Sequence, residues 1–146
     1  MTRDEFIAEY HKVSARAFLL SEKARREGLL SLEEKTDSDK LNRRDIFEYG
    51  LRFVVDGADA EIIRGILSNI IKQEEDKYAR RLMEIKEEAV LSIQAGDNPR
   101  IIAYKLNSFT DLTLTDDPII QKIMDEENEK GKFSDAEIDA LIGGSN

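Results

Sequence analysis

The sequence predicts an all-α fold, a compact helical bundle with one long central helix and a short C-terminal helical tail. Charged residues make up 36% of the 146 residues, and Glu, Lys, Arg, Ala, Ile and Leu are abundant, as in helical proteins with solvated surfaces. Apolar residues recur at spacings of three and four, which is the period of an amphipathic helix. Caps and breakers such as Gly96 and Asn98-Pro99 separate these segments. The length allows one modest core.

Residues 2–26 are predicted to form the clearest amphipathic helix. Its apolar stripe packs on other helices and consists of Phe6, Tyr10, Val13, Ala17, Leu20 and Ala24. Acidic residues lie near its start and basic residues near its end, as the helix dipole favours. Gly28 is expected to end it. The spacing of Ser31 and Glu34 then predicts a capping box that opens a short second helix.

The middle of the chain is predicted to hold a short helix and a long one. The short helix covers residues 43–55, stops at Asp56-Gly57, and contains Gly50, which suggests either a close helix crossing or a tolerated cost. Asp59 is a suitable N-cap for the next helix. No Gly or Pro occurs between Ser68 and Gln94, so local propensity favours one continuous helix over residues 60–94.

The last third of the chain carries repeated cap-then-proline signals. Gly96 ends the long helix, and Asn98-Pro99 and Asp117-Pro118 each start another. The second of these helices is strongly acidic and is expected to end at Gly131. We therefore divide the chain into a helical domain (residues 1–109), a linker with an acidic helix (residues 110–132) and a terminal tail (residues 133–146).

Composition argues against several functions. The net charge is −9, whereas a nucleic-acid-binding protein normally shows a basic stripe. With no Cys, one His and no phosphate-cradling Gly-rich loop, we expect no enzyme activity, no metal site and no cofactor. No apolar run approaches the length of a membrane helix, and the N-terminus has no signal-peptide core. We therefore expect a soluble, cytoplasmic protein without membrane insertion.

Two blocks of sequence resemble one known family. ARREGLLSLEE (residues 24–34) and GLRFVVDGADAEIIRGIL (residues 50–67) resemble the cytoplasmic loop between the second and third membrane helices of MotA, the proton-channel stator subunit of the bacterial flagellar motor. VLSIQAGDNPRIIAYKL (residues 90–106) is similar to the segment after its fourth membrane helix. The membrane helices themselves are missing, so the resemblance implies no ion channel.

The resemblance implies a charged partner-binding site. The cytoplasmic part of MotA contacts the rotor protein FliG through charged side chains. Arg25 matches the arginine before GLLSLE and Glu33 the glutamate after it, and Arg26 and Glu34 lie beside them. We expect these four residues to engage the rotor protein FliG or the stator MotA. The alternative is that they are only helix-terminal charges and a solvated cap.

The tail has a resemblance of its own. FSDAEIDALI (residues 133–142) is similar to the N-terminal peptide of the switch protein FliM, which binds the phosphorylated response regulator CheY. The resemblance implies that an amphipathic helix of the tail lies in a groove of the regulator. Its predicted contact residues are Glu137, Ile138, Leu141 and Ile142. The alternative is a capped helix that docks on its own domain.

A continuous helix over residues 60–94 would carry residues 94–109 about 50 Å from Ala60, so the second MotA-like block could not fold back on the first. Exchange of this helix between two chains would bring the blocks together again. We therefore predict a homodimer whose seam is formed by Tyr78, Leu82, Ile85 and Ala89, the alternative being that this stripe belongs to the core of one chain.

The function expected from all these features is a non-catalytic binding module, cytoplasmic and peripheral at the flagellar motor. A helical scaffold or assembly protein unrelated to motility is the alternative.

Overall fold

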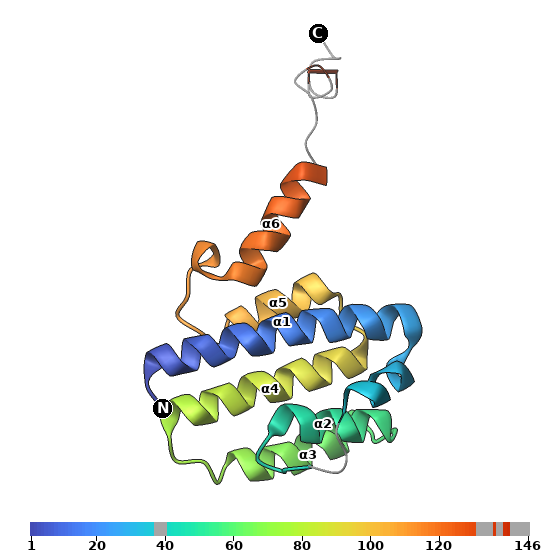
Figure 1. The fold of residues 1–146 in the computed structure, drawn as a ribbon, viewed down its shortest axis with the longest axis vertical. Helices are drawn as coiled ribbons and strands as arrows, with labels where there is room; N and C mark the ends of the chain where they lie inside the picture. The colour runs from blue at the N-terminus through green and yellow to red at the C-terminus, as the bar shows by residue number, and fades with distance from the viewer. Residues whose placement is uncertain (37–40, 131–135, 137–138, 141–146) are drawn as a thin grey trace.

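The computed structural model (Figure 1) describes residues 1–36, 41–130, 136, 139 and 140. These residues form helices joined by turns, without a strand in the part described, so the prediction of an all-α fold is confirmed. The elements in order are α1 (Arg3–Glu27), the 3-10 helix η1 (Leu29–Lys35), α2 (Ile46–Val55), α3 (Ala60–Ile71), α4 (Lys77–Ala95), α5 (Pro99–Asn107), the 3-10 helix η3 (Leu114–Asp116) and α6 (Pro118–Lys130).

Helix α4 is the centre of the bundle. It packs against α1, α2, α3 and α5, and its buried face includes Ile85, Ala89, Val90 and Ile93. Helix α2 crosses α4 closely at Gly50, where a Cβ atom would lie 3.0 Å from both methyl carbons of Val90. The close crossing suggested by the glycine in the sequence is therefore confirmed.

Helix α1 begins and ends where its sequence signals lie. Thr2 and Glu5 form a reciprocal capping box at its start, which satisfies two otherwise unpaired backbone N–H groups. Gly28 ends the helix with φ 89°, a conformation that only glycine adopts without strain. The capping box predicted at Ser31 is wrong, because its hydroxyl donates to the Gly28 carbonyl at 2.6 Å and η1 begins at Leu29.

The prediction of one continuous helix over residues 60–94 is wrong. Helix α3 ends at Ile71 and α4 begins at Lys77, and the two helices run antiparallel (Figure 1). Asp76 caps α4, since its Oδ1 accepts a hydrogen bond of 2.8 Å from the backbone N–H of Ala79. The chain therefore reverses direction between the two helices in a turn over residues 72–76.

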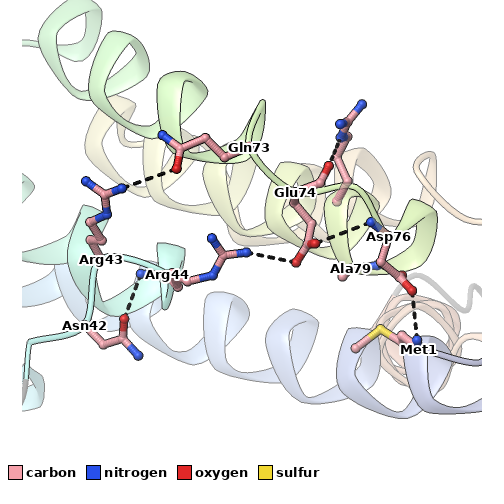
Figure 2. Close-up of polar contacts among 9 residues, drawn as sticks. Met1, Asn42, Arg43, Arg44, Gln73, Glu74, Asp76 and Ala79 are labelled. Carbon is pink, nitrogen blue, oxygen red and sulfur yellow. Dashed lines mark hydrogen bonds and ion pairs between the residues drawn. The ribbon is translucent and has the colours of Figure 1, made fainter.

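Distant residues hold this turn, as Figure 2 shows. Arg44 donates to Oε1 of Glu74 at 3.1 Å, and Arg43 donates to Oε1 of Gln73 at 3.3 Å. The N-terminal ammonium of Met1 lies 2.9 Å from Oδ2 of Asp76. The partners precede the turn by thirty residues or more in the sequence, so local turn chemistry did not reveal it.

The antiparallel turn removes the reason for a helix-exchanged homodimer. Of the four predicted seam residues, Leu82, Ile85 and Ala89 are buried within the chain. Tyr78 is half-buried, and its ring lies 5.3 Å from that of Phe6 on α1. This stripe is therefore part of the intramolecular core, and no exchange is needed to bring the two MotA-like blocks together.

Helix α6 starts on the bundle and extends away from it (Figure 1). Its apolar residues Ile120 and Ile123 pack with Ala103 of α5 in a small cluster, and Phe18 of α1 lies against that cluster. This cluster is separate from the main core.

A fully buried carboxylate also fastens α6. Asp117 caps the helix by accepting hydrogen bonds from the backbone N–H groups of Ile119 and Ile120 at 3.1 and 3.2 Å. Its other oxygen accepts from the Tyr10 hydroxyl and from the Asn107 side chain. Burial, together with this carboxylate, raises the pKa of Tyr10, so the phenol stays a hydrogen-bond donor. One side chain thus links α1, α5 and α6.

Candidate partner-binding site

The predicted charged site lies at the corner between α1 and η1. Gly28 turns the chain there, and its backbone N–H donates to the Ala24 carbonyl at 2.8 Å. Leu32 of η1 is fully buried in the main core, so the short 3-10 helix is anchored. The charged side chains of the corner therefore project from a fixed backbone.

The acidic side of the corner is a shallow, open depression that contains Glu33 and Glu34. Lys23 lies 2.8 Å from Oε2 of Glu27 and 2.8 Å from Oε1 of Glu34. These contacts raise the pKa of Lys23, and the hydrogen bond from Lys23 lowers the pKa of Glu34. Glu33 is exposed and forms no ion pair with any residue that the structure describes.

The basic side of the corner is a different depression. Arg25 and Arg26 line it together with Arg100, at the start of α5. The structure thus separates the four predicted residues into an acidic pair and a basic pair, and it adds Arg100 to the basic pair. Arg100 directly follows the predicted Asn98-Pro99 helix start, but no local sequence pattern identifies it as a site residue. Its position beside α1 depends on how α5 packs. Its guanidinium lies 3.2 Å from Oε1 of Glu127 on α6.

An apolar side chain lies among these charges. Leu30 lines the acidic depression and is 72% exposed, although its neighbour Leu32 is fully buried. Burying a leucine side chain at an interface contributes about 1.5–3 kcal/mol. The corner therefore combines a basic side, an acidic side and an apolar contact point.

Among the described residues, no three His, Asp or Glu side chains lie together so that they could hold a metal ion. None of the helices in that part of the chain has the length and apolar character needed to cross a membrane. The predicted tail residues Glu137, Ile138, Leu141 and Ile142 lie outside the described residues.

Comparison with known proteins finds relatives of part of the chain. Motility protein A of Treponema phagedenis is 38% identical over 88 residues, which is 58% of this chain and 32% of that protein. Motility protein A of Borreliella burgdorferi is 45% identical over 71 residues, or 47% of this chain and 26% of that protein. Motility protein A of Treponema pallidum is 38% identical over 74 residues, or 49% and 27% of the two chains.

No family model matches the chain, and no solved structure matches it. About half of this chain is a region related to Motility protein A. The match spans about a third or less of the length of each of these relatives.

Proposed function

We propose that this chain is a non-catalytic binding module of the bacterial flagellar motor, located in the cytoplasm at the motor's periphery. Its relation to Motility protein A over about half its length supports a role in motility. The resemblance of the α1–η1 corner to the MotA loop nominates the rotor protein FliG or the stator MotA as partner. Binding, without chemistry on a substrate, is the proposed activity.

The observation that carries this proposal is the arrangement of charge at the corner. Arg25 and Arg26 face one depression, and Glu33 lies on the other side beside exposed Leu30. Complementary charges on a partner would steer the encounter and set the orientation. Desolvation of the leucine would supply apolar binding energy.

A double charge reversal tests the site. We expect Arg25→Glu with Glu33→Arg to weaken binding of FliG or MotA about tenfold, since 1.4 kcal/mol of lost complementarity has that effect. Glu61→Arg with Arg64→Glu is the matched control, because both residues are exposed on α3 and the change leaves net charge equal. Isothermal titration with each purified partner measures the affinity. If both variants and the parent chain bound every motor protein with equal affinity, the proposal that Arg25 and Glu33 contact the partner would be wrong.

The tail is proposed as a second contact, with the phosphorylated response regulator CheY. Its support is the sequence resemblance to the FliM peptide, which places apolar residues at helical spacing. Leu141→Glu in the full chain should abolish regulator binding and leave binding at the corner unchanged. Capture of scaffold proteins only, with no motility protein retained by the parent chain, would favour the alternative of a helical scaffold.

A further inference from the structure

A groove runs between α1 and α6. Its apolar floor is formed by Phe18 and Leu19 of α1 and by Ile119 and Ile123 of α6, and it encloses about 380 Å³. Leu19 is 65% exposed, although it lies beside the small apolar cluster that attaches α6. The structure therefore leaves a hollow apolar surface open where two helices already meet.

Charged side chains of both signs line this groove, and an excess of basic side chains lies in the depression that adjoins it. Arg100 and Lys122 lie along it with Glu22 and Glu126, and the groove continues into the depression that holds Arg25 and Arg26 through the shared residues Phe18, Glu22 and Arg100. The groove itself holds two cations and two carboxylates, and Arg25 and Arg26 add positive charge where it meets the adjoining depression, although the chain as a whole has a net charge of −9. Glu127 pairs with Arg100 at 3.2 Å, whereas Arg25, Arg26 and Lys122 form no ion pair with any residue that the structure describes.

We propose that the groove binds residues 133–142 of the same chain. Helical spacing places the apolar side chains of Ile138, Leu141 and Ile142 on one face, with acidic Asp135 and Glu137 on either side of it. This segment therefore has an apolar stripe that matches the floor of the groove and acidic residues that match the basic side chains in and beside it.

The tail residues that the structure describes lie beyond the end of α6 and outside the groove (Figure 1), so the proposed docking requires the tail to fold back onto the bundle. Ala136, Asp139 and Ala140 are helical and exposed. At 100° per residue they share one face, which is opposite to the face of the apolar stripe. When the apolar stripe lies in the groove, these three residues therefore remain in solvent.

The chain can reach the groove without a long connection. Helix α6 ends at Lys130, and Glu126, about one turn earlier, lines the groove. Gly131 follows directly and tolerates the backbone conformation of a reversal. Ten helical residues measure about 15 Å, whereas the stretch of α6 from Ile119 to Glu126 measures about 10 Å. A helix that returns antiparallel to α6 therefore covers the whole groove.

Disulfide trapping in the full chain tests this proposal, because the sequence has no Cys. The test variant combines Leu19→Cys with Leu141→Cys. The matched control combines Ile101→Cys with Leu141→Cys, since Ile101 is 53% exposed on α5 but does not line the groove. With mild oxidant at low protein concentration, we expect the intrachain disulfide to form about tenfold faster in the test variant. Adding Lys122→Glu should slow it, and high salt should slow it too.

Two outcomes would overturn the proposal. Equal trapping rates in the test and control variants would show that the tail does not prefer the groove. Disulfide-linked dimers at the same low concentration would show that a second copy fills it. The experiment uses no motor protein, so its failure is distinguishable from a failure of binding at the corner. The proposed response regulator would compete with the groove for the same residues of the tail.

Discussion

The body around α4 and the helix α6 are held in different ways. Helix α4 buries apolar residues against four neighbouring helices, whereas α6 buries two isoleucines in a small separate cluster and depends on Asp117. A large contiguous core unfolds as one cooperative unit, but an element with few contacts opens alone. We therefore expect α6 to unfold at a lower free energy than the body around α4 does.

The largest expected effect is on the body. Ile85→Ala removes a fully buried side chain from the centre of α4 and should lower the free energy of unfolding by about 3 kcal/mol. Urea denaturation followed by circular dichroism measures this loss. Ile62→Ala on α3 is the control, since Ile62 is 54% exposed, and it should change the value by less than about 0.5 kcal/mol. Equal losses for both variants would contradict the assignment of α4 as the centre.

The next effect separates α6 from the body. Asp117→Ala removes the cap of α6 and leaves buried donors of Tyr10 and Asn107 without their acceptor. A lost cap costs about 1 kcal/mol and an unpaired buried donor about 1–3 kcal/mol. We expect hydrogen exchange at the Ile120 amide to accelerate about a hundredfold or more, while exchange at the Ile85 amide changes far less.

Asp116→Ala is the control for this experiment, because Asp116 is exposed and adjacent. It should leave both amides protected as in the parent chain. If Asp117→Ala accelerated exchange at Ile120 and Ile85 equally, α6 and the body would form one cooperative unit, and the comparison would fail.

The smallest effect is at the turn before α4. Asp76→Ala removes a partly exposed cap and the partner of the N-terminal ammonium, so it should lower the melting temperature by less than Ile85→Ala does. The hydrogen bond from the Ala79 N–H lowers the pKa of Asp76. The ionised Asp76 carboxylate therefore stabilises the folded state at neutral pH, and this stabilisation is lost as the pH falls through that lowered pKa.

Glu75→Ala is the control at the turn, because Glu75 is exposed and caps no helix. Melting curves at neutral pH and near pH 2 measure both variants. The difference between them should shrink in acid, where the Asp76 carboxylate becomes protonated. A difference that stayed constant with pH would exclude a contribution from the charged carboxylate.

Much of the fold could be predicted from local sequence. The capping residues Thr2, Asn98 and Asp117 start their helices as their chemistry requires, and the apolar stripe of α1 is buried from Phe6 to Leu20. These features depend on residues a few positions apart. Gly50 also signalled its close crossing, because a helical glycine needs a reason in packing.

The turn between α3 and α4 could not be predicted in this way. Local propensity favoured a continuous helix, but Arg43, Arg44 and the N-terminus supply partners from elsewhere in the chain. The same limit applies to the candidate site. Arg25 and Glu33 are close in sequence, yet they line two different depressions. Arg100 joins the basic depression only through the packing of α5 beside α1.

The way Asp117 is attached has a mechanical consequence. A pulling force applied beyond the C-terminal end of α6 reaches the buried carboxylate and its small apolar cluster before it reaches the α4 core. Helix α6 would therefore detach first and lengthen the molecule, while the body around α4 stayed folded and the α1–η1 corner kept its conformation.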